Sequence, residues 1–548
     1  MNFRVGIFRV GIIKKSAAMG LALVIFAACA TAAPGDTAGA PAAGTAPAAT
    51  PAPAGTAETA AEPQYDAQAG GEATWITAAF PPSLDPHIPS DTTSRDVIRQ
   101  IMEPLLAFGP GDVIEYRLAT SFENLDPVTW QFNLRQGVTF HDGAPFNSEA
   151  VYLTFNRMLD PENAKPRRLI LEMIEEVVII DDYTVNLITT VPFGPFPAQL
   201  TNFAASILSP LAIAEEEAGG RVVALNPVGT GPFQVADIVP GEYVRIERFD
   251  DYWGDIAYLD SVVFRTVPDP ATRMLMLQAG ETNGMLATVA DIFALETMTG
   301  VDFVLHPSMA MHFIGMNTSA EPFNDIRVRH AVSMAVNLDD ILHGVMESHG
   351  FLAQGPIHPA VAFSPFHDVQ RTQRDVEAAR TLIQEAGIYG RDISFVYFTG
   401  DATRTHIAQV VQANLAEIGL NVNISSMEWA AFLQDVTAGN SEMFTLSWAN
   451  STGDADGSVH ALFHSDSIGA VNRTFFNNPQ ADALINAGRS ETNASLRYGI
   501  YRELVELLIY EAPMVFMFHP YSPFATYGID GLFLDITGVP YFQRVTLR

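Results

Sequence analysis

The loop over residues 450–457 holds the densest group of side chains that could bind a ligand. It supplies hydroxyl groups at Ser451 and Thr452 and carboxylates at Asp454 and Asp456, which suit a polar or cationic group. The two aspartates could equally cap turns, because Asp-x-Asp-Gly is common turn chemistry. They do not form a calcium loop, because the required glycine and distal glutamate spacing is missing. Ligand contact and turn capping both stay open for this pair.

Three more side chains are candidates for the same site. Arg404 opens a helix predicted over 401–418, where it could bind a ligand carboxylate or pair with Asp401. We favour the surface pairing with Asp401. Trp429 and Trp448 could line a cleft, but large aromatic side chains beside strands are more often core residues. We therefore expect both tryptophans in the core.

Two motifs that contain histidine could indicate metal binding or catalysis. His460 and His464 lie four residues apart, as metal ligands on one helix face do, but no third ligand is fixed and no His-Glu-x-x-His motif exists. His141 and Asp142 precede Gly143, a combination typical of a turn rather than of a catalytic pair. No Gly-x-Ser-x-Gly motif is present. The sequence therefore predicts no metal site, no cofactor and no enzyme activity.

Net charge and composition exclude or disfavour further classes of protein. The 548 residues include 30 Lys+Arg and 62 Asp+Glu, which gives a net charge of −32. Such a surface repels phosphate backbones, so nucleic acid is excluded as a partner. The single cysteine excludes a disulfide framework, and Lys165 is the only lysine after the N-terminal segment. P-loop and Schiff-base enzymes, which need a lysine in a pocket, are thereby disfavoured.

The N-terminus is predicted to direct export. Residues 1–28 have the pattern of a signal peptide, with a basic start and an apolar stretch too short for a comfortable membrane span. Cys29 follows small residues in a run that resembles the bacterial lipoprotein box, which implies lipidation and a membrane anchor at Cys29. Plain secretion after cleavage nearby is the alternative. Residues 29–72, rich in Ala, Pro, Thr and Gly, are predicted to be a flexible tether.

Alternating strand and helix patterns predict an α/β fold. A βαβαβ unit is expected, with parallel strands over 393–398, 420–424 and 443–448 and helices over 401–418 and 429–438. Ligands of open α/β sheets bind beyond the carboxyl ends of strands, and the loop at 450 follows the third strand. Other predicted elements are a strand over 129–134, a helix capped by Asn147 or Ser148, and helices over 326–345, 375–386 and 493–511.

Seven motifs occur in an order that resembles the family 5 extracellular solute-binding proteins of ABC importers, the peptide and nickel group. They cover the chain from about residue 75 to 520 and lie at Ser83–His87, Phe132–Gly143, Asn226–Phe233, Asp251–Gly254, Met316–Thr318, Asp325–Val332 and Gly355–Pro359.

The resemblance implies a two-lobed periplasmic-binding-protein fold with an extra domain, mixed sheets with helices on both faces, and a ligand cleft between the lobes. It also implies a monomer that works with the membrane subunits of an ABC permease in the periplasm or at the cell surface. The implied division is lobe I over 73–105, 229–305 and 518–548, domain II over 106–228, and lobe III over 306–517.

The loop after Trp448 indicates the ligand class. Peptide-binding relatives hold the peptide amino group with an aspartate three residues after such a tryptophan, where this chain has Ser451. The run over 448–456 is more similar to that of the glutathione-binding branch. We therefore expect capture of glutathione or a short oligopeptide by hinge closure. A sugar oligomer or chelated nickel, a sensing protein without a transporter, and a secreted hydrolase are the alternatives.

Overall fold

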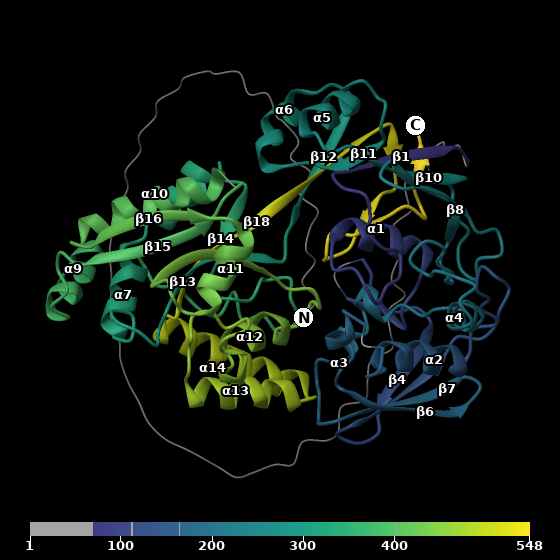
Figure 1. Cartoon of the computed structure of the whole chain (residues 1–548), viewed down its shortest axis with the longest axis horizontal. Coiled ribbons are helices and arrows are strands. Elements are labelled where there is room, and N and C mark those ends of the chain that lie inside the picture. The colour runs from purple at the N-terminus through teal and green to yellow at the C-terminus, as the bar shows by residue number, and fades with distance from the viewer. Residues whose placement is uncertain (1–69, 111–112, 164, 401) are drawn as a thin grey trace, which may run out of the picture. The chain divides into compact units, whose positions relative to one another are not determined.

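The protein is represented by a computed structural model that describes residues 70–110, 113–163, 165–400 and 402–548 (Figure 1). The predicted signal peptide, Cys29 and nearly all of the tether lie outside the described residues. The chain divides into Met1–Asp66 and Ala67–Arg548, and the description concerns the second unit by itself.

A mixed sheet of twelve strands runs through the folded unit. Its strand order is β16-β15-β17-β13-β18-β11-β1-β10-β9-β8, with β12 and β14 also paired to β18. The bounds are β16 (Asn421–Met427), β15 (Asp392–Phe398), β17 (Met443–Ala449), β13 (Ala310–Met316), β18 (Met514–Tyr527), β11 (Gly284–Leu286), β1 (Glu72–Thr77), β10 (Ser261–Thr266), β9 (Tyr243–Arg248), β8 (Phe233–Val239), β12 (Val301–Pro307) and β14 (Gly350–Leu352).

The long strand β18 joins the two halves of this sheet. Its first part, up to Phe518, pairs antiparallel with β13, and its last part, from Tyr521, pairs antiparallel with β12 and then with β11. Figure 1 shows β18 extending from the β13 side toward β11 and β1. The expected boundary between residues 517 and 518 therefore falls inside a continuous strand.

The predicted βαβαβ unit is confirmed. β15 pairs in parallel with both β16 and β17, and the connections contain α10 (Ala402–Glu417) and α11 (Trp429–Thr437). Gly419 and Gly439, just past the two helices, have φ of +87° and +73°, a region that glycine adopts without strain. The carboxyl ends of β15, β16 and β17 therefore meet at one edge of the sheet.

Of the other predicted helices, two are confirmed and one is wrong in its length. α9 (Val376–Glu385) and α14 (Ala494–Glu511) lie within one residue of their predicted bounds. The helix expected over 326–345 breaks into α7 (Ile326–Ala335), α8 (Leu338–Asp340) and a π-helical turn. The break occurs because Asn337 is extended and its side chain accepts a hydrogen bond from the backbone of Asp340, which starts a new helix.

A second sheet lies outside the large one, in the order β4-β5-β7-β6. The strand predicted over 129–134 is its β5, and the predicted cap Asn147 accepts from the Ala150 N–H at 3.2 Å. Its members and the helices around them are β4 (Ala119–Asn124), β5 (Thr129–Leu134), β7 (Thr184–Thr189), β6 (Ile174–Asp181), α2 (Ser148–Leu159), α3 (Phe196–Gln199) and α4 (Pro210–Glu217). The remaining main elements are α1 (Thr92–Ile101), β2 (Leu106–Phe108), β3 (Ile114–Tyr116), α5 (Pro270–Gln278), α6 (Ile292–Thr297), α12 (Asp456–Phe463) and α13 (Pro479–Ser490).

A buried ion-pair network ties the first predicted motif to the helices beside it. Arg157 of α2 donates to Asp85 at 2.7 and 3.2 Å, and to Glu216 of α4 at 2.8 and 3.0 Å. Burial opposes ionisation of Asp85, but the hydrogen bonds and charge of Arg157 nevertheless lower its pKa. The motif around Asp85 therefore has a packing role.

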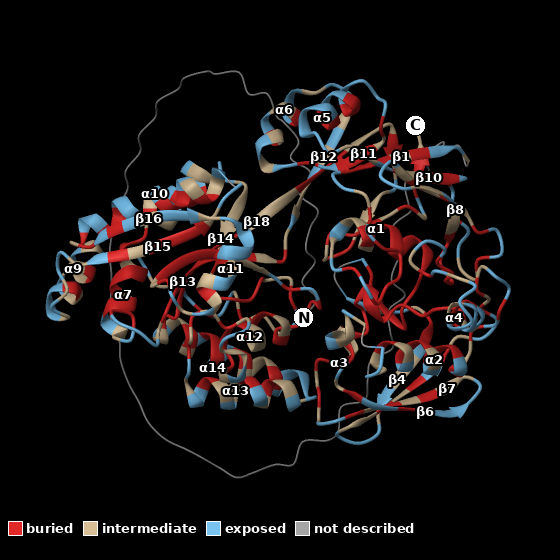
Figure 2. Cartoon of the chain, viewed as in Figure 1, coloured by how far each residue is buried: buried red, intermediate tan, exposed pale blue. Residues whose placement is uncertain are grey.

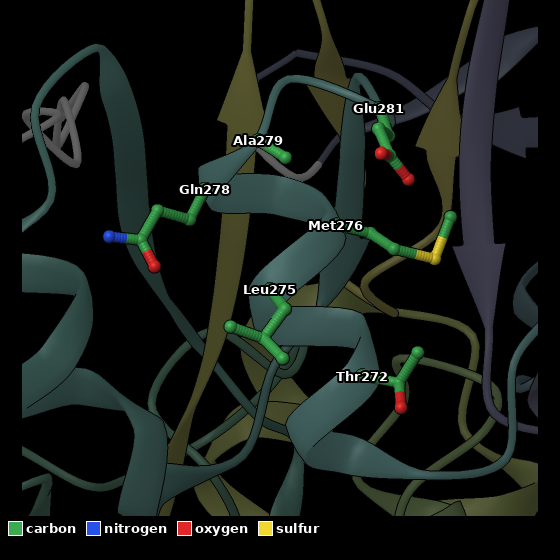
Figure 3. Close-up of a pocket in the computed structure, with 6 residues that line it drawn as sticks. All are labelled: Thr272, Leu275, Met276, Gln278, Ala279 and Glu281. Carbon is green, nitrogen blue, oxygen red and sulfur yellow. The ribbon is translucent and has the colours of Figure 1, made fainter.

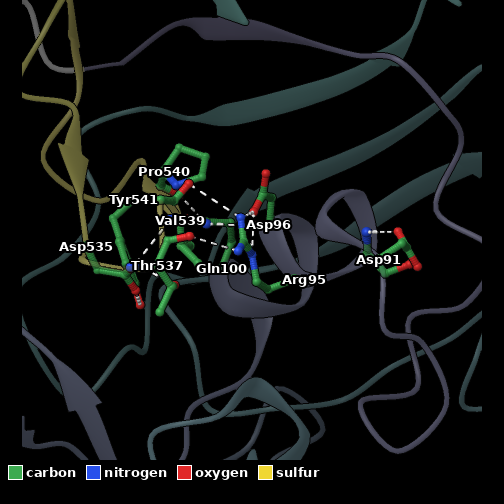
Figure 4. Close-up of polar contacts among 11 residues, drawn as sticks. Asp91, Arg95, Asp96, Gln100, Asp535, Thr537, Val539, Pro540 and Tyr541 are labelled. Carbon is green, nitrogen blue, oxygen red and sulfur yellow. Dashed lines mark hydrogen bonds and ion pairs between the residues drawn. The ribbon is translucent and has the colours of Figure 1, made fainter. Parts of the chain in front are cut away.

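Helix α1 is fixed to the C-terminal segment by a second network (Figure 4). Arg95 uses all three guanidinium nitrogens, donating to Asp96 from Nε and Nη2 and to the Thr537 carbonyl from Nη1. Gln100 donates to the Pro540 carbonyl at 2.8 Å. Figure 2 shows α1 among the buried segments of the chain.

Within the described residues, no helix has the length and apolar character of a membrane span.

Buried titratable groups predict that acid destabilises the fold. Burial lowers the pKa of six histidines to between about 2 and about 4, against about 6.5 when unfolded: His87, His141, His312, His358, His460 and His519. Below about pH 6.5 the unfolded chain therefore binds six protons that the folded chain does not. Burial raises the pKa of Asp96 and Asp456 to about 6, and the protons that these two carboxyl groups bind in the folded chain offset only two of the six. Urea titrations should show the free energy of unfolding falling near pH 5 by more than about 1.4 kcal/mol per pH unit, which is the slope that one unmatched proton gives. His519→Gln should flatten this slope, and stability that rises between pH 6 and 4.5 contradicts the prediction.

Candidate functional site

The carboxyl ends of β15 and β17 bring together a cation and two aromatic rings. The guanidinium carbon of Arg404 lies 4.2 Å from the ring centroid of Phe398, the last residue of β15. The Phe398 ring packs edge-on against Trp429 with centroids 4.7 Å apart. Arg404 also lies within 3.4 Å of the Ser447 hydroxyl of β17. A cation over aromatic faces at strand ends is chemically suited to an acidic, partly apolar ligand.

Two of the sequence-based expectations are wrong at this edge. Arg404 is only 5% exposed and not on the surface, because α10 packs it against Phe398 and β17. Its expected pairing with Asp401 lies outside the described residues. Trp429 was expected in the core, but it is 45% exposed. It is the first residue of α11, directly beyond β16, where the sheet that would cover it has ended.

Trp448 braces the loop that follows it. Its ring is half-buried, and its indole N–H donates to the Gly457 carbonyl at 2.8 Å. The side chain therefore packs on the core with one part and closes the loop with the other, rather than lying wholly in the core.

Asn450 organises the loop, a role that the sequence analysis missed. Its side-chain oxygen accepts from the backbone of Thr452 and Gly453 at 3.0 and 2.9 Å, and its amide donates to the Asp454 carbonyl at 2.7 Å. Gly453 has φ of +67°, and a Cβ there would lie 2.4 Å from the Phe108 ring. An Asn followed by a glycine three residues later is a signal for such a turn.

Asp454 is engaged by a buried arginine. Its two carboxylate oxygens accept from Arg497 at 2.5 and 2.7 Å, and the side chains are 3% and 2% exposed. Its Oδ1 also accepts from the Asp456 N–H at 2.9 Å, which is the turn-capping role considered from the sequence. The Arg497 guanidinium lies 4.5 Å from the Phe363 ring centroid. Arg497 lies 43 residues away on α14, so no local pattern pointed to it. Ligand contact by Asp454 stays a prediction.

Asp456 differs from Asp454 because one oxygen of its carboxylate accepts no hydrogen bond from the described residues. It is 5% exposed, and its Oδ1 has no hydrogen-bond partner in the part of the chain that the structure describes. The nearest cation is Arg489, whose Nε lies 3.4 Å from that oxygen. Burial raises the pKa of Asp456 to about 6. This carboxylate can still accept a hydrogen bond from a ligand.

The two hydroxyl residues of the loop have different surroundings. Ser451 is exposed, and its carbonyl accepts from the Asn202 side chain at 3.3 Å. Thr452 is buried and its hydroxyl lies 3.3 Å from the Asn450 oxygen. Ser451 is therefore the loop hydroxyl that is open to a solute.

The histidines considered as metal or catalytic residues contact other groups of the protein. The rings of His460 and His464 stack at 5.0 Å, and His464 contacts the Asn486 amide at 3.0 Å. Among the described residues, no cluster of three or more His, Cys, Asp and Glu is arranged to hold a metal. His141 contacts the Gly231 carbonyl at 2.9 Å, whereas Asp142 accepts from the Ser209 hydroxyl at 2.5 Å, so each side chain is hydrogen-bonded to another residue and not to the other.

A surface hollow of about 380 Å³ lies along α5 (Figure 3). Its lining offers one carboxylate and one amide among mostly apolar atoms, from Thr272, Leu275, Met276, Gln278, Ala279 and Glu281. None of the predicted ligand residues belongs to it, so we place the candidate site at the strand ends instead.

The chain belongs to the bacterial extracellular solute-binding proteins, family 5, which it matches over residues 113–470. Proteins of this family are solute-binding proteins of ABC importers, the class that the motifs resemble.

Similar proteins support this assignment. The glutathione-binding protein GsiB of Pectobacterium atrosepticum is 29% identical over 447 residues, covering 79% of this chain and 86% of that protein. The periplasmic binding protein DppA of Helicobacter pylori, solved with the peptide STSA, is 28% identical with a TM-score of 0.73, covering 88% of this chain and 98% of that one. HbpA2 of Haemophilus parasuis is 25% identical with a TM-score of 0.80, covering 87% and 100%. The expected two-lobed fold is confirmed.

The Asp454–Arg497 pair predicts a large stability effect. Asp454→Asn leaves a buried guanidinium without its counter-charge, so we expect a loss of about 3–5 kcal/mol in the free energy of unfolding, measured by urea titration. As a control, Glu377→Gln removes an exposed partner of Arg380 and should cost less than about 1 kcal/mol. If Asp454→Asn is no less stable than this control, the pair does not hold the loop.

Proposed function

We propose that this protein is the substrate-binding component of an ABC importer for glutathione or a short peptide. The observation that carries the proposal is the loop 448–456 at the carboxyl ends of parallel strands, with a serine at 451 and its acidic side chains at 454 and 456. The similarity to relatives named glutathione-binding proteins, and to a peptide-bound neighbour, supports this ligand class.

In the proposed mechanism, two lobes close on the solute. Lobe I comprises 73–105, 229–305 and 518–548, domain II comprises 106–228, and lobe III comprises 306–517. β18 is the strand through which the two halves of the sheet would hinge, since it pairs with both. Differential affinity for the closed form drives closure, and the permease recognises that form.

Each candidate side chain has a proposed role in the cleft. Trp429 and Trp448 supply apolar contact beside the strand ends, and Ser451 supplies a hydroxyl. Asp456 accepts from the ligand ammonium, because one of its oxygens is not already in a hydrogen bond. Thr452 and Asp454 hold the loop, since both are buried against protein partners. Arg404 contributes positive charge at the strand ends.

Calorimetry with glutathione and with a pool of short peptides tests the proposal. A charge-assisted bond to an ammonium contributes about 1.5–3 kcal/mol, so Asp456→Asn should weaken binding about 10- to 150-fold. Because the pKa of Asp456 is about 6, wild-type affinity should fall between pH 7 and 5, and the variant should lose this dependence.

Asp466→Asn is the matched control, because its carboxylate is 88% exposed and should leave binding unchanged. If the ligand binds and Asp456→Asn matches wild type, Asp456 has no ligand role. If neither glutathione nor peptides bind wild type, the ligand class is wrong, and a sugar oligomer or chelated nickel takes its place.

We also propose that the mature protein is exported and anchored through a lipidated Cys29. The sole cysteine follows the apolar stretch at the one position where lipidation would use it. Mass analysis of membrane-extracted protein should give an acylated N-terminal Cys29. An unmodified mature chain that starts at another residue contradicts the anchor.

A further inference from the structure

Arg99, in the last turn of α1, has unused hydrogen-bond donors in a buried position. It is 8% exposed, and only its Nη2 is bonded, to the Thr201 carbonyl. Its Nε and Nη1 are buried and have no partner among the residues described. Arg95, one turn earlier, has partners for all three nitrogens (Figure 4). A buried cationic donor without an acceptor is costly, so Arg99 is suited to bind an acceptor that the described part of the chain does not supply.

The carboxylates on this helix and just after it already accept hydrogen bonds from the protein. Glu103 accepts from the Trp253 indole at 2.7 Å, the Tyr252 hydroxyl at 2.8 Å and the Thr230 hydroxyl at 3.0 Å. Asp96 accepts from Arg95 at 2.8 and 3.0 Å. Neither carboxylate accepts a hydrogen bond from Arg99, so an acceptor for its Nε and Nη1 must come from elsewhere.

The segment that holds Arg99 adjoins the loop of the candidate site. Thr201, which holds Arg99, is followed by Asn202, whose side chain donates to the Ser451 carbonyl. A second arginine flanks the same segment, because the guanidinium of Arg167 lies 5.5 Å from the Phe203 ring centroid and its buried Nε has no partner among the described residues. Two cations with unused donors therefore flank a three-residue segment that contacts the loop.

A carboxylate is the chemical group that these donors fit. Guanidinium groups form their strongest hydrogen bonds with planar oxyanions, and burial strengthens such a bond because water does not compete. The net charge of −32 disfavours anion binding to the surface in general, so an anion needs a local group of cationic donors such as these buried arginines.

We propose that Arg99 binds a carboxylate of the solute, on the α1 side of the loop 450–457. The inference rests on the proposed function, and it adds that the solute must present an acidic group to α1 as well as an ammonium to Asp456. Glutathione and peptides carry both groups.

Calorimetry with glutathione on wild type, Arg99→Met and Arg99→Lys tests the proposal. Met keeps the apolar stem and removes the charge, so affinity should fall about 10- to 100-fold, whereas Lys should restore part of the loss. Arg95→Met is the matched control: it alters a partly buried arginine of the same helix whose three nitrogens all donate to protein atoms, so affinity should stay within about threefold of wild type.

Equal affinities of wild type and Arg99→Met overturn the proposal and leave the proposed function standing. An equal loss in Arg95→Met also overturns it, because the effect then comes from damage to α1.

A second probe separates the carboxylate site at Arg99 from the proposed ligand class. Glutarate, compared with chloride at equal ionic strength, should raise the melting temperature of wild type and not of Arg99→Met. If glutathione does not bind but glutarate acts in this way, the carboxylate site stands and the ligand class falls. If glutathione does not bind and glutarate acts on both proteins equally or on neither, the carboxylate site falls as well.

Discussion

The buried pairing of Asp454 with Arg497 is the constraint on which the candidate site depends. The Asp454 carboxylate, buried and held by two hydrogen bonds, fixes one end of the loop after β17 to helix α14. Asn450 fixes the other end through the backbone of residues 452 and 453. The loop therefore has a defined shape before any solute arrives. Preorganisation of this kind lowers the entropy that binding must otherwise overcome.

The charged side chains around that loop are of two kinds. Some have all their hydrogen bonds within the protein and stabilise the fold, and others keep an atom that can bind a ligand. Asp454 and Arg95 have their hydrogen bonds filled by the protein. Asp456 and Arg99 are equally buried, but each keeps an atom without a hydrogen-bond partner among the described residues. One is an acceptor and the other a donor, so the arrangement favours a zwitterionic solute over a simple anion or cation.

Local patterns predicted the elements well but not the pairings between distant residues. The βαβαβ unit and the cap at Asn147 follow from hydrophobic period and capping chemistry, and the structure has both. The burial of Arg404 could not be predicted, because it depends on how α10 packs on Phe398. Arg497 lies 43 residues from its partner Asp454, a separation over which a single sequence carries no contact signal.

The most direct test of the account is the crystal structure of the protein grown with glutathione. We expect ligand density beside Trp448 and Ser451, with the ligand ammonium within hydrogen-bond distance of Asp456 and a ligand carboxylate within hydrogen-bond distance of Arg99. Density for glutathione away from the loop 450–457, for instance in the hollow along α5, would contradict it.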